Sequence, residues 1–127
     1  MAEHLRIIVL EGDDTGQELL EQAVRVLDPA VTKVELELEH YDLSLDNRRK
    51  TGNEVVSAAA KAIAEARFGL KAATITPEDK DDVGSPNRLL REAIDGKVII
   101  RTGRRIPDAF CSADHLAAWA RAGGRWG

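Results

Sequence analysis

Two stretches of the sequence gather side chains that could bind a small anion. Thr74 and Thr76 stand at the end of a short apolar run, and Ser85 opens a helical segment that carries Asn87 and Arg91. The free amides and the dipole of a helix start favour a bound anion. A guanidinium can bind a carboxylate through two parallel hydrogen bonds. Together these residue types favour a site for a carboxylate or a phosphate.

More arginines follow the next apolar run. Arg101 comes directly after residues 98–100, with Arg104 and Arg105 close behind. In parallel α/β sheets ligands bind at the carboxyl ends of strands, which is where these residues are expected. Each of them also has a plainer interpretation. Ser85 followed by proline is most often a helix cap, a lone arginine is most often a solvated charge, and threonine is common in strands.

The remaining chemistry-bearing residues predict no metal site and no catalytic group in this chain. Residues 12–16 match neither a dinucleotide-binding glycine motif nor a P-loop, so we expect a strand-to-helix turn there. The acids of residues 79–82 lack the pattern of a calcium loop and are expected to be solvated. His4, His40 and His115 are scattered, and Cys111 has no adjacent motif.

The elements that must hold these residues alternate between strand and helix. Residues 5–10 form an apolar run that predicts a strand buried on both faces. Residues 33–41 alternate leucine or valine with glutamate, which predicts a strand near a sheet edge. Further strands are expected over residues 69–76 and from residue 98, and a loop is expected over residues 41–52. Helices are expected from the 13–15 turn to Pro29, over residues 53–67, over 85–94 and over about 113–122. This order predicts an α/β fold with a mainly parallel sheet and covering helices.

Composition and charge narrow the class of protein. The chain has 127 residues, is 43% hydrophobic and 31% charged, and carries a net charge of −4. That balance argues against broad binding to nucleic acid or to an anionic membrane. No apolar run is long enough to cross a bilayer, and the first residues show no secretion signal. One cysteine allows no internal disulfide, so we expect a cytoplasmic protein.

Three motifs resemble the isocitrate/3-isopropylmalate dehydrogenase family. Residues 69–78, GLKAATITPE, and residues 84–91, GSPNRLLR, are especially similar to isocitrate dehydrogenases. Residues 9–18 are similar to the family's first strand and its G-D-G-I-G-P-E turn, where Asp14, Thr15 and Gln17 replace a glycine, an isoleucine and a proline. The resemblance covers residues 1–107 as a partial α/β segment of that fold, and residues 108–127 form an unmatched tail, expected to be helical.

The resemblance implies NAD- or NADP-dependent oxidative decarboxylation of a 2-hydroxy acid, with Mg or Mn as the metal. It implies substrate-binding positions at Thr76, Ser85, Asn87, Arg91 and Arg101, and positions near the cofactor at Lys71, Thr74, Thr76 and Asn87. In the family, the metal-binding aspartates, the catalytic lysine and tyrosine, and the adenosine loop lie downstream of these motifs. We therefore expect a truncated or partial member that is inactive alone and binds no cofactor tightly.

Two other functions stay open. The chain could be a non-catalytic module that binds a polycarboxylate or a nucleotide or pairs with a complete partner chain, or it could be a truncated product with no selected activity. The partners expected are a small polycarboxylate and a second copy of the chain, since a partial sheet leaves strand edges unpaired. Leu116 and Trp119 in the tail offer an apolar stripe for such a contact.

Overall fold

A computed structural model describes residues 5–101 of the chain. The chain divides into two units, of which the first ends at Lys97 and the second begins at Val98. Residues 98–101 are the described part of the second unit. The helix expected over residues 113–122 lies outside the described residues, as do Arg104, Arg105 and Cys111.

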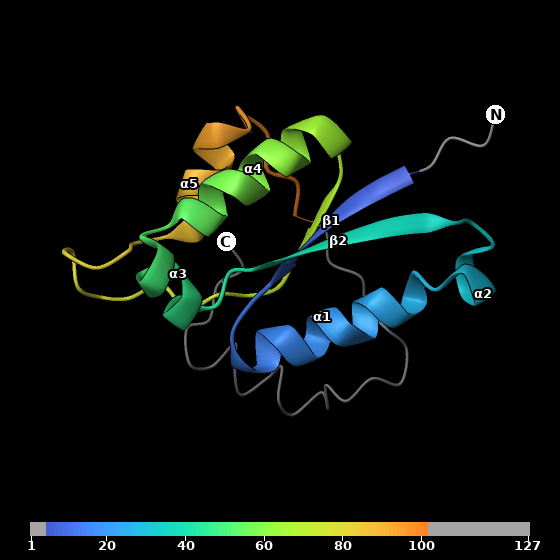
Figure 1. The fold of residues 1–127 in the computed structure, drawn as a ribbon, viewed down its shortest axis with the longest axis horizontal. Coiled ribbons are helices and arrows are strands. Elements are labelled where there is room, and N and C mark those ends of the chain that lie inside the picture. Colours follow the sequence, from blue (N-terminus) through green and yellow to red (C-terminus); the bar gives the residue numbers. More distant parts are fainter. Residues whose placement is uncertain (1–4, 102–127) are drawn as a thin grey trace, which may run out of the picture. The chain divides into compact units, whose positions relative to one another are not determined.

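The first unit is built on a parallel sheet of three strands in the order β2-β1-β3 (Figure 1). β1 (Leu5–Glu11) pairs with β2 (Leu36–Asp42) from Leu5 opposite Leu36 to Glu11 opposite Asp42. It pairs on its other side with β3 (Gly69–Lys71). The alternation of strand and helix therefore gives the parallel α/β arrangement predicted from the sequence.

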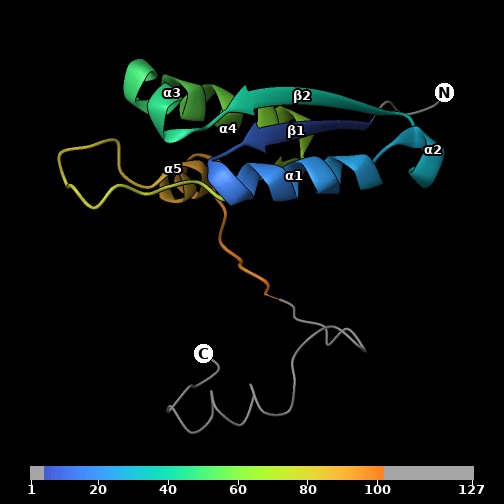
Figure 2. The same cartoon turned by 90° about the horizontal axis from the view of Figure 1, so that it is seen from below.

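Helices cover both faces of this sheet. α1 (Asp14–Val26) lies on one face and α4 (Glu54–Ala66) on the other, with α5 (Pro86–Ala93) packed beside α4 (Figures 1 and 2). Consecutive side chains of β1 point to opposite faces, so Val9 packs with Leu20 of α1 while Ile8 packs toward α4. β1 is thus buried on both faces at Ile8, Val9 and Leu10, as its mostly apolar sequence predicts. The α4 side of the core consists mainly of Ile8, Leu10, Leu43, Val56, Ala59, Ala60, Ala62 and Leu90.

The loop prediction for residues 41–52 is wrong, because α3 (Leu45–Thr51) occupies most of that segment. Ser44 begins the helix, and its hydroxyl accepts a hydrogen bond from the Asn47 amide at 3.4 Å. Gly52 ends it in the left-handed conformation. The helix shows no apolar period because its one buried side chain is an arginine, Arg48.

Two strand predictions are also wrong in part. The strand expected over residues 69–76 ends at Lys71, because the next residues bind the turn after β1 instead of a strand. The Ala73 carbonyl accepts from the Asp13 amide at 3.1 Å. Residues 98–101 form no strand. Branched side chains favour a strand only when a neighbouring strand supplies hydrogen bonds.

Short elements complete the first unit. α1 ends at Val26, and Pro29 opens a separate turn of helix, α2 (Pro29–Thr32), with the Asp28 carboxylate as its cap. β2 begins at Leu36, three residues later than the alternating pattern indicates, after Lys33 has ended α2 in the left-handed conformation. β2 is an edge strand of the described sheet, as predicted.

Candidate functional site

Lys71 lies at the carboxyl end of β3, where its ammonium is fixed by two hydrogen bonds. The Nζ atom donates to the Ala72 carbonyl and to the Thr74 hydroxyl, both at 2.8 Å. The side chain is half-buried, and burial lowers the pKa of Lys71 to about 8, with the Arg48 charge acting in the same direction. The two bonds use two of the three ammonium donors.

Asp13 joins the turn after β1 to two distant segments. Its Oδ1 accepts from the Leu45 amide at 2.9 Å, and its Oδ2 accepts from the Ile75 amide at 2.8 Å. Asp13 occupies the N-cap of α1 but makes no side-chain cap bond. Its carboxylate instead holds the start of α3 and the Thr74–Thr76 segment.

Gly12 and Gly16 let that segment approach the turn closely. A Cβ atom at Gly16 would lie 2.6 Å from the Ala73 carbonyl oxygen and 2.8 Å from the Ala73 Cβ, and one at Gly12 would overlap the same oxygen. No side chain fits at either position without movement of the backbone. Close packing against Ala73 therefore explains the glycines at positions 12 and 16, which are also similar to glycines of the family's turn.

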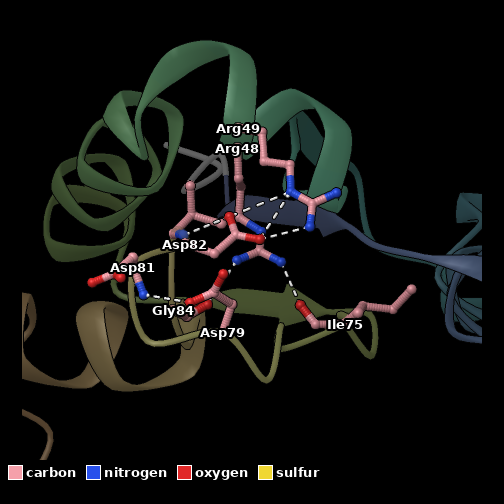
Figure 3. A network of polar contacts seen from close by, with 8 residues as sticks. Arg48, Arg49, Ile75, Asp79, Asp81, Asp82 and Gly84 are labelled. Carbon is pink, nitrogen blue, oxygen red and sulfur yellow. Dashed lines mark hydrogen bonds and ion pairs between the residues drawn. The ribbon is translucent and has the colours of Figure 1, made fainter.

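Arg48 of α3 is fully buried and donates to three backbone carbonyls, of which those of Ile75 and Gly84 belong to residues labelled in Figure 3. Its Nε bonds Leu43 at 3.0 Å, its Nη1 bonds Gly84 at 3.1 Å, and its Nη2 bonds Ile75. Burial lowers the pKa of Arg48, and the charges of Asp13 and Asp82 oppose that shift. The guanidinium thus supplies one hydrogen-bond donor to each of three carbonyls, which lie at the ends of the strands and loops around it.

Two neighbouring side chains hold the loop of residues 76–84, called here the acidic loop. Arg49 binds the Asp82 carboxylate, with Nη2 at 2.6 Å from Oδ2 and Nε at 3.1 Å, and lowers the pKa of Asp82 (Figure 3). Asn53 donates through Nδ2 to the Val83 carbonyl at 2.7 Å. The prediction that the acids of this loop are solvated is wrong for Asp82, whose side chain is 17% exposed.

The predicted site residues fall into linked pairs. Lys71 and Thr74 are hydrogen-bonded. Thr76 follows Ile75, and Ser85 follows Gly84. Arg48 bridges the carbonyls of Ile75 and Gly84. Ser85 is the N-cap of α5, and its side chain makes no cap bond.

Asn87 and Arg91 share one face of α5, as their spacing predicts. The Arg91 Nε donates to the Asn87 carbonyl at 3.0 Å, and both side chains are exposed. Arg101 belongs to the second unit, and its side chain is exposed.

Sequence reasoning missed the polar residues that organise this site: Asp13 as a link between segments, the buried Arg48, Arg49 and Asn53. The available signal was the Ser44 cap, the run of polar helix formers after it, and Gly52 as a stop. That signal identifies α3 as a helix but not the partners of its arginines.

The donor set of the first unit suits an anion and not a metal ion. Across residues 5–101 no three histidine, cysteine, aspartate or glutamate side chains gather so as to hold a metal ion. Mg and Mn prefer carboxylate oxygens, so the residues described here do not fit the metal that the family resemblance implies. Within the same residues no helix is both long enough and apolar enough to cross a membrane.

Comparison with known proteins agrees with these motifs. The family model for isocitrate/isopropylmalate dehydrogenase matches residues 6–115. Isocitrate dehydrogenase (NADP) of Sphingobium yanoikuyae is 30% identical over 100 residues, which cover 72% of this chain and 24% of that protein. The peroxisomal isocitrate dehydrogenase (NADP) of Candida tropicalis is 39% identical over 71 residues, or 50% of this chain and 17% of that protein. The mitochondrial isocitrate dehydrogenase (NADP) of Saccharomyces cerevisiae is 28% identical over 100 residues, which cover 72% of this chain and 23% of that protein. The matched region thus spans about a quarter or less of the length of these relatives.

Proposed function

The chain belongs to the isocitrate/isopropylmalate dehydrogenase family, and on that premise we propose that residues 71–91 form part of a binding site for a small polycarboxylate and for NADP. The proposed reaction of the site is the oxidative decarboxylation of a 2-hydroxy acid. The choice of NADP over NAD is supported by the names of the relatives, which are isocitrate dehydrogenases (NADP). Both proposed ligands are multiply charged anions.

The observation that carries the proposal is the Lys71–Thr74 pair at the carboxyl end of β3. A half-buried ammonium held by Ala72 and Thr74 presents a positive charge in a fixed direction. Burial strengthens its attraction for a carboxylate or a phosphate, because water screens the pair less. Carboxyl ends of parallel strands are also where ligands of α/β sheets bind.

The ends of the acidic loop and the start of α5 support the same ligand class. Thr76 and Ser85 supply hydroxyls on either side of the Arg48 bridge, and the first amides of α5 point away from their own helix. Asn87 and Arg91 add an amide and a guanidinium on the next turn. Arg101 is proposed as a further substrate contact on family resemblance alone.

We assign these residues the roles of binding and orienting the two ligands. NADP, when bound, would accept the hydride from the 2-hydroxy acid. No metal ligand and no proton-transfer group is assigned within residues 5–101, so we expect the purified chain to reduce no NADP when it is mixed with isocitrate and magnesium.

Calorimetric titration of the chain with isocitrate and, separately, with NADP tests the proposal. The wild type is expected to bind weakly, and Lys71→Met to lose at least about tenfold in affinity, because a charge-assisted hydrogen bond contributes about 1.5–3 kcal/mol. Lys61→Met, at an exposed position on α4, is the matched control and should bind like the wild type. Absence of binding by the wild type, or equal affinity in Lys71→Met, would contradict the proposal.

A further inference from the structure

One side chain, that of Arg48, is hydrogen-bonded at both ends of the acidic loop. The Ile75 carbonyl precedes the loop and the Gly84 carbonyl closes it, and both accept hydrogen bonds from the Arg48 guanidinium (Figure 3). The third bond, from Nε to Leu43 at 3.0 Å, anchors the same group at the end of β2. One planar group therefore joins the end of β2, the exit from β3 and the entry to α5.

The peptide groups around Ile75 are held from both sides by opposite charges. The Asp13 carboxylate accepts from the Ile75 amide at 2.8 Å, and the Arg48 guanidinium donates to the Ile75 carbonyl. Residue 75 lies between Thr74 and Thr76, so the direction of both hydroxyls depends on this arrangement. A buried charge stays in place when its hydrogen bonds are satisfied, and here the bonds fall on backbone that cannot turn away.

The loop has two further attachments, both next to its Gly84 end and neither at Ile75. Arg49 binds the Asp82 carboxylate, and Asn53 binds the Val83 carbonyl. Neither residue contacts Ile75 among the hydrogen bonds of the described residues. Arg48 is the side chain there that bonds both ends of the loop.

We propose that Arg48 is a positioning residue of the binding site, which fixes the separation of Thr76 and Ser85 by bridging the Ile75 and Gly84 carbonyls. Its effect on ligand affinity rests on the proposed function, whereas the bridge itself can be tested without a ligand. Lysine cannot replace it, because an ammonium on a flexible stem lacks the planar fork that reaches two carbonyls at once.

Amide hydrogen exchange followed by NMR in the full chain is the test, with Arg48→Lys as the variant. The Ile75 and Val83 amides should exchange at least about tenfold faster in the variant, while the Ile8 and Leu10 amides of β1 keep their rates. Affinity for isocitrate and for NADP should fall by about tenfold in the same variant. Arg25→Lys, the same substitution at an exposed position of α1, should change neither quantity.

The outcomes separate the two proposals. Unchanged exchange at Ile75 and Val83 overturns the positioning role, and so does a uniform acceleration that includes β1, because that marks a loss of global stability. If the Ile75 and Val83 amides exchange faster in the variant but the wild type binds neither isocitrate nor NADP, the bridge is supported and the proposed function is overturned. If Arg48→Lys fails to fold, guanidinium exchange in the wild type is the test. Slower exchange of the Arg48 guanidinium protons than of those of the exposed Arg25 supports the bridge, and equal rates overturn it.

Discussion

Asp13 shows how one carboxylate can organise a site without touching a ligand. Its two oxygens accept from amides that lie in α3 and in the segment after β3. Asp13→Asn replaces one oxygen by an NH₂ group, which faces an amide donor instead of accepting from it. We expect the free energy of unfolding in urea to fall by about 1–3 kcal/mol. Asp14→Asn, exposed and with φ of 45°, is the control, since asparagine tolerates that conformation. An equal loss in both variants would argue against the link.

Lys71 makes stability depend on pH in a defined direction. Its pKa is about 8 in the folded chain against 10.5 for an ordinary lysine, so between these values the unfolded chain holds more protons. Free energy of unfolding therefore rises with pH from this residue alone. Urea unfolding of the wild type and of Lys71→Met from pH 7 to 10 should show their stability difference moving in favour of the wild type. A difference that stays flat or moves the other way would refute the assignment, and Lys61→Met controls for other titrations.

The same group gives anion binding the opposite dependence. As pH rises through about 8, Lys71 loses its proton and with it the charge that attracts a carboxylate or a phosphate. Affinity for isocitrate should therefore weaken above this pH in the wild type and vary much less in Lys71→Met. Calorimetry at pH 6.5 and at pH 9.5 measures both slopes.

At this scale the sequence predicts the residue types of the site but not the groups that hold them. Thr74, Thr76, Ser85 and Arg91 belong to motifs that can be recognised along the chain. Arg48 bonds carbonyls 27 and 36 residues away, and a carbonyl carries no sequence signature. A lone arginine in a polar stretch is most often solvated, so its complete burial depends on tertiary packing that no local pattern encodes.

Among the elements, the turn from β1 into α1 depends on close packing against residue 73. Gly16→Ala places a methyl group 2.6 Å from the Ala73 carbonyl oxygen, and the obstacle is backbone that cannot rotate away. Alanine favours a helix over glycine, yet we expect a net loss of about 1–3 kcal/mol because overpacking outweighs the propensity gain. Gly96→Ala, where the nearest atom is 3.5 Å away, should be tolerated. Urea unfolding distinguishes the two, and a more stable Gly16→Ala would mean that the close approach is absent.

Elements with an apolar period were predictable and those held by polar anchors were not. β1, α1 and α4 lie where their apolar residues place them, because each buries apolar side chains in the core around the sheet. α5 lies where its Ser85–Pro86 start places it. α3 was missed because its buried anchor is Arg48. β3 was overextended because the hydrogen bonds of residues 73 and 75 go to Asp13 instead of to a strand.

At the scale of the whole molecule, the first unit presents sheet edges and apolar side chains that could contact another copy. β2 and β3 are the edge strands of the described sheet, and Leu19 and Val26 of α1 are 71% and 62% exposed. Exposed strand edges recruit other chains, and identical chains form symmetric dimers most readily. Light scattering over a tenfold range of concentration should show a mass above 13.9 kDa. A constant 13.9 kDa would exclude association, and dissociation by Trp119→Asp would identify the tail as the contact.

Whether residues 71–91 bind the proposed ligands is tested most directly by a ¹H–¹⁵N NMR titration of the full chain with isocitrate and NADP. Family membership and the Lys71–Thr74 geometry predict that shifts concentrate in those residues, centred on Lys71, Thr76 and Ser85. The shifts should disappear in Lys71→Met and persist in Lys61→Met. Saturating ligand that leaves these amides unmoved, or shifts that gather on α2 and the far end of α1 instead, would contradict the assignment.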